Sequence, residues 1–206
     1  MPPLVDPVIE RVLSEFERRA EEEQRRTNFS APGTNLDDLL LSVGREAGIL
    51  LYLLATGAGS KRILELGTSY GYSTVWLAAA ARATGGKVTS LELREFKIEH
   101  ARQALTRAGL STRVEFHAGD CLDTLKRLPG PFDFVLLDVW KDLYLPCFEL
   151  VHPKLSLGGI IAADNMLLPE SARQQAESYR ARVRAAGDMD SVLIPVGNGI
   201  EVSRKR

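Results

Sequence analysis

Short apolar runs alternate with helical patterns along most of this chain, and this alternation restricts the fold more than any other feature. The runs have the length of buried strands, and segments with helical periodicity separate them. Such an order is typical of a parallel sheet with helices on both faces. We therefore expect an α/β fold with a doubly wound sheet. The expected strands are residues 62–66, 87–92, 114–117, 134–137 and 159–163, and the helices between them are residues 73–82, 94–108, 121–128 and 142–151.

The carboxyl-terminal part of the chain departs from that alternation. After a helical pattern at 170–186, two apolar runs flank Gly197-Asn198-Gly199. Asn-Gly between apolar runs is a strong signal for a β-hairpin. We therefore expect residues 191–196 and 200–203 to pair as an antiparallel hairpin that completes a mostly parallel, seven-stranded sheet. Glu201 is expected on the surface of its strand.

The amino-terminal part carries two further helical patterns, at 7–26 and 36–54, with a turn-rich linker at 27–35 between them. We expect both helices to lie over the site. The first of them either pairs subunits in a homodimer or caps the site. The whole chain, residues 1–206, is expected to be a single domain, with a helix and linker at 1–35 and a cofactor-binding core at 36–206.

The balance of residues favours a protein that acts on small molecules. Of 206 residues, 45% are hydrophobic and 26% are charged, which suits one globular domain with a sizeable core. A net charge of -1 provides no field that attracts a polyanion, so no nucleic-acid partner is expected. No apolar stretch approaches the roughly 20 residues of a membrane helix, and the amino terminus lacks a signal pattern, so we expect a cytoplasmic protein with no membrane partner. Cys121 and Cys147 are expected to be small, reduced core residues.

Acidic side chains stand at the ends of the first three expected strands, where an open parallel sheet binds its ligands. These side chains are Glu65, Glu92 and Asp120. The turn after Glu65 lacks the full G-x-G-x-x-G pattern, and the carboxylate of Glu65 would repel a phosphate. Glu92 stands where an acidic side chain accepts hydrogen bonds from a ribose. A cationic nucleoside such as S-adenosylmethionine therefore fits these strand ends better than a dinucleotide does.

Hard oxygen ligands follow the next two strands. Asp138 follows 134–137, and Asp164-Asn165 follows 159–163. Two carboxylates and an amide suit a divalent cation such as Mg2+, and Lys141 is expected to face the same space. Each of these groups has a simpler interpretation when taken singly. Asp164-Asn165 suits a helix cap, Trp140 suits a core position and Lys141 suits a solvated pair with Asp142, but their joint order favours a site.

At these residues the chain resembles the cation-dependent O-methyltransferases, the class I S-adenosylmethionine-dependent family of the catechol and caffeoyl-coenzyme A enzymes. The run from Leu137 to Asp142 resembles the Leu-Asp-His-Trp-Lys-Asp of the catechol enzyme, and Ala163-Asp164-Asn165 follows at the family's distance. The run 194–200 is closer to the caffeoyl-coenzyme A branch. Val139 and Asn198 stand where the catechol enzyme has a histidine and a carboxylate. The resemblance covers roughly residue 41 to the end and implies a Rossmann-like fold.

The resemblance also implies roles for individual residues. Lys141 matches the general base of the family, and Asp138, Asp164 and Asn165 match its metal ligands. The positions implied to bind S-adenosylmethionine are Val43, Glu65, Gly67, Tyr70, Ser73, Glu92, Asp120, Cys121 and Asp138. The positions implied to contact an aromatic substrate are Leu41, Trp140, Pro169 and Asn198.

We therefore expect divalent-cation-dependent transfer of a methyl group from S-adenosylmethionine to a hydroxyl of a small aromatic diol, of the catechol or caffeoyl type. Two alternatives stay open at this point. One is a metal-independent methyltransferase of the same fold. Sensitivity of the activity to a chelator distinguishes it from the cation-dependent enzyme. The other is a module that binds S-adenosylmethionine without catalysing a reaction. Turnover on a panel of diols would distinguish an enzyme from such a module.

Overall fold

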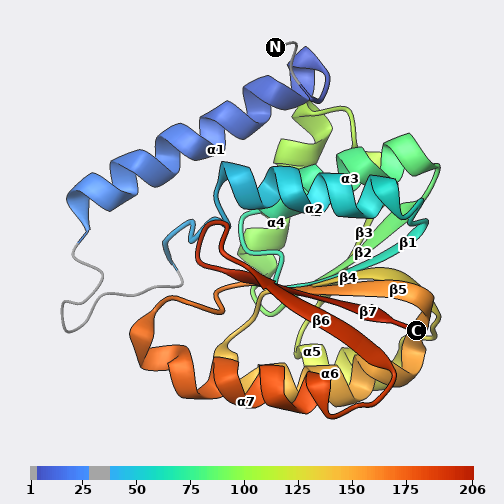
Figure 1. Cartoon of the computed structure of the whole chain (residues 1–206). Helices are drawn as coiled ribbons and strands as arrows, with labels where there is room; N and C mark the ends of the chain where they lie inside the picture. Colours follow the sequence, from blue (N-terminus) through green and yellow to red (C-terminus); the bar gives the residue numbers. More distant parts are fainter. Residues whose placement is uncertain (1–3, 28–37) are drawn as a thin grey trace.

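The computed structural model describes residues 4–27 and 38–206 (Figure 1). Its strands are β1 (Arg62–Leu66), β2 (Lys87–Glu92), β3 (Val114–Ala118), β4 (Phe132–Leu137), β5 (Leu155–Ala163), β6 (Met189–Ile194) and β7 (Ile200–Lys205). They form one seven-stranded sheet in the order β3-β2-β1-β4-β5-β7-β6. The first five strands run parallel, and β7 runs antiparallel to both of its neighbours. The predicted mostly parallel sheet with a carboxyl-terminal hairpin is confirmed.

Helices cover both faces of this sheet, as the cartoon makes visible (Figure 1). The helices are α1 (Pro7–Arg26), α2 (Arg45–Gly57), α3 (Tyr72–Thr84), α4 (Glu95–Arg107), α5 (Cys121–Arg127), α6 (Tyr144–Val151) and α7 (Arg173–Arg184). Helices α1 to α4 share one apolar core with one face of the sheet, and α5 to α7 share a second core with the other face. Neighbouring strand residues such as Val135 and Leu136 enter opposite cores, as the alternation of side chains along a strand requires. Within the described ranges, no helix is both long and apolar enough to cross a membrane.

Helix α1 has a clear start and a clear apolar face. The carboxylate of Asp6 accepts a hydrogen bond from the backbone nitrogen of Val8 at 2.8 Å, and Pro7 suits the first helical position because it lacks a backbone N–H. The helix packs against α3 and α4. Its buried stripe consists of Ile9, Val12, Leu13 and Phe16. The amphipathic pattern in the sequence therefore identified this helix correctly.

The second helix begins later than the sequence pattern indicated. Most of the predicted linker 27–35 and the predicted start at residue 36 lie outside the described residues, but residues 40–44 are not helical and α2 begins at Arg45. Leu41 and Gly44 have φ values of 41° and 82°, which a right-handed helix does not accommodate. The guanidinium of Arg45 then anchors the first turn of α2 to Glu17 of α1 at 3.0 Å. The described apolar residues at 40–43 belong to an irregular segment that leads into the helix.

Glu201 is buried, so its predicted place on the surface is wrong. Strand β7 lies between β5 and β6, and α7 covers the face on which the side chain of Glu201 lies. The carboxylate accepts hydrogen bonds from Arg180 at 2.8 Å, from Arg184 at 3.2 Å and from the hydroxyl of Ser191 at 2.7 Å. The side chain has 0% exposure, so two arginines and a hydroxyl replace the water that a surface glutamate would have.

Replacing Glu201 with alanine is expected to lower the free energy of unfolding by about 3 kcal/mol, because the change breaks a buried, hydrogen-bonded ion pair. Urea denaturation measures the effect. The matched control is Glu149→Ala, which removes the partner of Arg182 on the same helix at 2.7 Å, but between side chains that are 38% and 52% exposed. The control substitution is expected to lower the free energy of unfolding by less than about 1 kcal/mol. Equal losses in the two variants would contradict the structural role given to Glu201.

Candidate active site

Glu65 is the first of the acidic residues at which the sequence predicts a cofactor. It lies near the end of β1 and is fully buried. Its carboxylate accepts hydrogen bonds from the hydroxyls of Ser73 at 2.7 Å, Thr74 at 2.7 Å and Ser90 at 2.5 Å. Burial raises the pKa of Glu65 to about 7, against the opposite effect of the three hydroxyls. The side chain is therefore held in one position and gains charge near neutral pH.

The glycine turn after β1 brings the ends of β1 and β4 together. Gly67 has a φ of 97°, and a Cβ built on it would lie 1.9 Å from the backbone oxygen of Asp138. The backbone nitrogen of Asp138 donates to the carbonyl of Leu66 at 2.9 Å. Only glycine fits where the backbones approach this closely. The turn thus sets Asp138 beside the end of β1.

The next two acidic strand ends lie in order along the same edge of the sheet. Glu92 ends β2, and its carboxylate accepts hydrogen bonds from the backbone nitrogens of Ser69 at 2.8 Å and Arg94 at 3.0 Å. Asp120 follows β3 and caps α5, where it accepts from the backbone nitrogen of Asp123 at 3.0 Å. Asp120 thus has the simple capping role, and its contact with a cofactor stays a prediction. Because β1, β2 and β3 are neighbours, Glu65, Glu92 and Asp120 share one edge.

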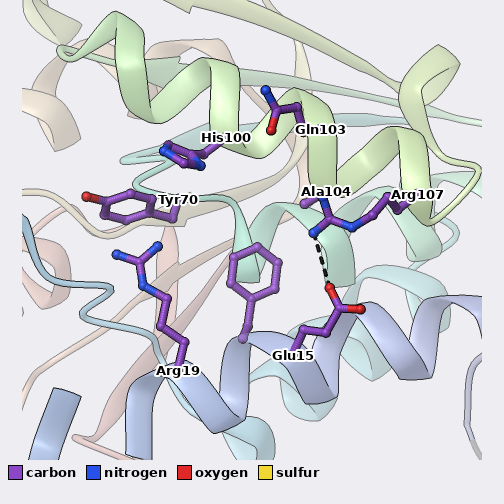
Figure 2. Close-up of a pocket in the computed structure, with 8 residues that line it drawn as sticks. Glu15, Arg19, Tyr70, His100, Gln103, Ala104 and Arg107 are labelled. Carbon is purple, nitrogen blue, oxygen red and sulfur yellow. Dashed lines mark hydrogen bonds and ion pairs between the residues drawn. The ribbon is translucent and has the colours of Figure 1, made fainter. Parts of the chain in front are cut away.

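Tyr70 lies in a pocket between α1 and α4 (Figure 2). Its hydroxyl donates to the carbonyl of Asp38 at 3.2 Å, and the guanidinium of Arg19 stands 3.9 Å from the centre of its ring. The ring of His100 packs against the ring of Tyr70 in a tilted arrangement, with 5.3 Å between the ring centres. The pocket has a volume of about 140 Å³. The side chain of Tyr70 therefore joins the turn after β1 to α1. Its contact with the cofactor stays a prediction.

Asp164 carries the most unusual carboxylate of the site. It follows β5 and is 1% exposed, and neither of its carboxylate oxygens has a hydrogen-bond partner among the described residues. Burial, aided by the negative charge of Asp138, raises the pKa of Asp164 to about 8, against the weaker opposite effects of the backbone N–H of Asn165 and the charge of Lys141. Burial also raises the pKa of Asp138 to about 6. A buried carboxylate without partners is costly unless a cation or donor joins it.

The side chains around Asp164 suit a cation of the Mg2+ kind. Asp138 is close enough to Asp164 for the two charges to affect each other, and the backbone nitrogen of Asp164 donates to the carbonyl of Leu137 at 3.1 Å. Asn165, with a φ of 55°, directly follows and offers an amide oxygen. In the part of the chain that the structure describes, no three histidine, cysteine, aspartate or glutamate side chains gather as a metal cluster. The oxygen groups available beside Asp164 are two carboxylates and one amide, which is a kind of set that suits Mg2+.

Lys141 joins the two strand ends that carry these oxygen groups. Its Nζ donates to the hydroxyl of Tyr144, to the backbone oxygen of Asp164 at 3.1 Å and to Oδ1 of Asn165 at 3.5 Å. Burial lowers the pKa of Lys141 to about 8, although the charges of Asp138 and Asp164 act in the opposite direction. The structure therefore brings Lys141, Asp164 and Asn165 together, as the sequence pattern indicated.

Tyr144 is a member of this group that sequence reasoning missed. It is fully buried, and its hydroxyl donates to the backbone oxygens of Leu137 at 3.1 Å and Asp164 at 3.0 Å. It stands three residues after Lys141, a spacing that places both side chains on one face of a helical turn. This three-residue spacing is the sequence signal from which the contact of Tyr144 with Lys141 could have been predicted. Tyr144 holds the ends of β4 and β5 in register beneath Lys141.

Two of the predicted substrate positions carry exposed apolar side chains. Trp140 is 56% exposed, and Leu41 is 45% exposed. The backbone oxygen of Asn198 accepts from the nitrogen of Leu167 at 2.8 Å, so the hairpin turn lies against the segment that leads from Asn165 to Pro169. Val43, by contrast, is buried. Exposed apolar groups beside a polar centre are suited to a flat aromatic ligand.

Comparisons with known proteins agree with this geometry. A family model described as "Methyltransferase domain" matches residues 64–166. A catechol O-methyltransferase of Mycobacterium tuberculosis is 36% identical over 72% of this chain and 70% of its own length, and caffeoyl-CoA O-methyltransferase 1 of Zea mays is 29% identical over 81% and 72%. An O-methyltransferase of tomaymycin synthesis from Streptomyces achromogenes, solved in complex with SAM, is 27% identical with a TM-score of 0.78 and covers 98% of this chain and 92% of its own.

The sheet topology is that of a class I methyltransferase. Within that class, the chain belongs to the S-adenosylmethionine-dependent O-methyltransferases, in the family of the catechol and caffeoyl-coenzyme A enzymes. The resemblance inferred from the sequence is thereby confirmed, and the protein is an S-adenosylmethionine-dependent enzyme of the catechol and caffeoyl-coenzyme A type.

Proposed function

We propose that this enzyme transfers the methyl group of S-adenosylmethionine to a hydroxyl of a small aromatic diol, and that the reaction uses a divalent cation, Mg2+ first among the candidates. Asp138, Asp164 and Asn165 would hold the cation. The observation that carries the proposal is the buried carboxylate of Asp164, whose oxygens have no partner among the described residues. A bound cation would remove the cost of that burial.

The proposed acceptor has two kinds of support. The curated relatives are named for catechol and for caffeoyl-CoA, and both compounds contain neighbouring aromatic hydroxyls. The exposed side chain of Trp140, next to Lys141, suits an aromatic ring at the rim of the site. A diol also offers two oxygens in the arrangement that a single cation can bind.

The mechanism assigns the chain's own residues to positioning and to proton transfer. Methyl transfer is an in-line displacement in which a new O–C bond forms as the S–C bond breaks, so much of the barrier comes from alignment. Glu65 and Glu92 would orient the cofactor, and the oxygen ligands would orient the acceptor. A divalent cation, when bound, lowers the pKa of the acceptor hydroxyl. Lys141 would accept the hydroxyl proton on Nζ, and its lowered pKa supports that role.

Chelation tests the metal part directly. Activity on a panel of catechols and caffeoyl esters is expected to vanish in excess chelator and to return with added MgCl2. Mono-hydroxylated analogues serve as the matched control, because they keep the ring and remove one of the two oxygens. Full turnover of a diol in excess chelator would replace this proposal with a metal-independent methyltransferase.

Cofactor binding is expected to tighten by about tenfold between about pH 6 and about pH 8, because the ionised fraction of a group with a pKa of about 7 rises from about one tenth to about nine tenths over that range. The sign follows from charge, since the ionised form of Glu65 attracts the cationic amino group of the ligand. Calorimetric titration with S-adenosylhomocysteine measures the effect. The variant Glu65→Gln keeps the shape of the side chain and is expected to bind weakly with a flat pH profile. A wild-type profile that matches the variant would remove Glu65 from cofactor binding.

Other expectations from the sequence stay predictions. They are the single-domain organisation of residues 1–206, a cytoplasmic location, a homodimer and the lack of a nucleic-acid partner.

A further inference from the structure

Cys121 and Cys147 lie against each other, although 26 residues separate them in the chain. Cys121 is the first residue of α5, Cys147 lies in α6, and these two helices pack side by side beneath the sheet (Figure 1). Their sulfur atoms are 3.8 Å apart. They are the two cysteines of the sequence, and both thiols are free. The sequence-based expectation of small, reduced core residues did not foresee this contact, and Cys121 is only partly buried.

The two thiols have unequal environments. Cys121 is partly exposed, and the hydrogen bond with the other thiol lowers its pKa. Cys147 is fully buried, and that same hydrogen bond, together with burial, raises its pKa. A reactive cysteine needs access and thiolate character, and a nearby second thiol can resolve its oxidised form. Cys121 fits the first role and Cys147 the second.

We propose that Cys121 and Cys147 form a reversible disulfide when the protein meets a hydroperoxide. The thiolate of Cys121 attacks the terminal peroxide oxygen, the O–O bond breaks, and a sulfenic acid forms on Cys121. The leaving hydroxide or alkoxide takes up the proton that the Cys121 thiol released and departs as water or an alcohol. The sulfur of Cys147 then attacks the sulfenic sulfur, the S–S bond forms, and water leaves with the thiol proton. Two thiols are oxidised by two electrons and one peroxide is reduced by two. A dithiol such as dithiothreitol reverses the change.

Only a small movement of the two sulfur atoms is needed to form the disulfide. A disulfide holds its sulfur atoms about 2.05 Å apart, so the two sulfurs must approach by about 1.8 Å. Cys147 is fixed in the second core beside Phe148, whose ring stacks on His152. The approach therefore falls mainly on the partly exposed Cys121 and on the turn before it.

That turn is part of the proposed cofactor site. Asp120 immediately precedes Cys121, and the backbone nitrogen of Gly119 donates to the carbonyl of Glu92 at 2.9 Å. A displacement of Cys121 is thus passed to two acidic strand ends that are proposed to bind the nucleoside. We expect the oxidised protein to bind S-adenosylhomocysteine about tenfold more weakly than the reduced protein. This consequence rests on the proposed function, whereas the disulfide itself does not.

Mass spectrometry of the full chain after titration with hydrogen peroxide tests the disulfide. The expected product is a monomer that has lost two hydrogen atoms, contains one peptide crosslink between positions 121 and 147, and regains both thiols with dithiothreitol. The control Cys147→Ser is expected to gain oxygen on Cys121 instead. If that variant does not fold, Cys121→Ser, at the partly exposed position, is expected to keep a reduced Cys147. Addition of oxygen without a crosslink in the wild type, or crosslinks between chains, would overturn the proposal.

Calorimetric titration of the reduced and oxidised wild type with S-adenosylhomocysteine tests the consequence for binding. The reduced Cys147→Ser variant controls for loss of the thiol itself and is expected to bind like the reduced wild type. An unchanged affinity in a protein that carries the disulfide would overturn the link to the cofactor site. Weak binding by reduced and oxidised wild type alike would instead count against the proposed cofactor site.

Discussion

Replacing Asp164 with alanine is expected to make the metal-free enzyme more stable and, at the same time, at least about 10³-fold less active. The gain in stability follows because the variant no longer buries a carboxylate whose oxygens have no partner among the described residues. We expect it to be about 1 kcal/mol, or an increase in Tm of roughly 2–4 °C for a chain of this length. The loss of activity follows from the loss of a cation ligand, since Lewis-acid stabilisation is worth several kcal/mol in a transition state.

Thermal denaturation of protein first treated with chelator measures the stability change, with and without added MgCl2. Added MgCl2 is expected to raise the Tm of the wild type and to leave that of Asp164→Ala unchanged. Asp142→Ala is the matched control, because Asp142 is an exposed carboxylate beside Lys141 with no assigned role in catalysis. A metal-free variant less stable than the wild type, or an active one, would contradict the role given to Asp164.

Replacing Lys141 with methionine is expected to lower kcat by about 10²- to 10⁴-fold, the usual contribution of a general base. Methionine keeps most of the length and apolar volume of the lysine but cannot accept the proton. Binding of S-adenosylhomocysteine is expected to be unchanged, because Nζ contacts Tyr144, Asp164 and Asn165 rather than Glu65 or Glu92. Single-turnover kinetics with saturating MgCl2 and cofactor isolate the chemical step.

The variant Lys141→Arg separates proton transfer from simple positive charge. Arginine keeps the charge near the two carboxylates but does not deprotonate in proteins. We expect it to lose as much kcat as Lys141→Met. Recovery of most of the activity in Lys141→Arg would mean that Lys141 acts by fixing Asn165 and the end of β5, and not as a base.

Much of the fold was predictable because its signals are local. The central strands are buried on both faces, so each reads as an apolar run, and strand β2 was predicted with its observed limits. The early part of β5 was missed because Gly158 and Gly159 interrupt the apolar pattern, although the strand begins at Leu155. The late start of α2 was missed because the backbone conformation of Leu41 leaves no mark in the pattern of apolar residues.

The placement of the candidate site residues was predictable where it depends on strand ends. Asp138, Asp164 and Asn165 follow parallel neighbours, and such ends meet at one edge of a sheet. The burial of Glu201 depends instead on which strand lies beside β7 and on α7 above it, which no short segment encodes. The contact between Cys121 and Cys147 likewise arises from the packing of α5 on α6.

The position of β7 has a consequence for how the enzyme is made. Among the described strands, β6 pairs with β7 alone, and β7 also covers the edge of β5, the strand that leads to Asp164. During synthesis on the ribosome, β6 therefore emerges before its sheet partner, and β5 keeps an open edge until residues 200–205 have left the exit tunnel. A nascent chain that stalls before Ile200 lacks two strands of its sheet rather than one. We expect such chains to be inactive and to be recognised by chaperones through the exposed edge of β5.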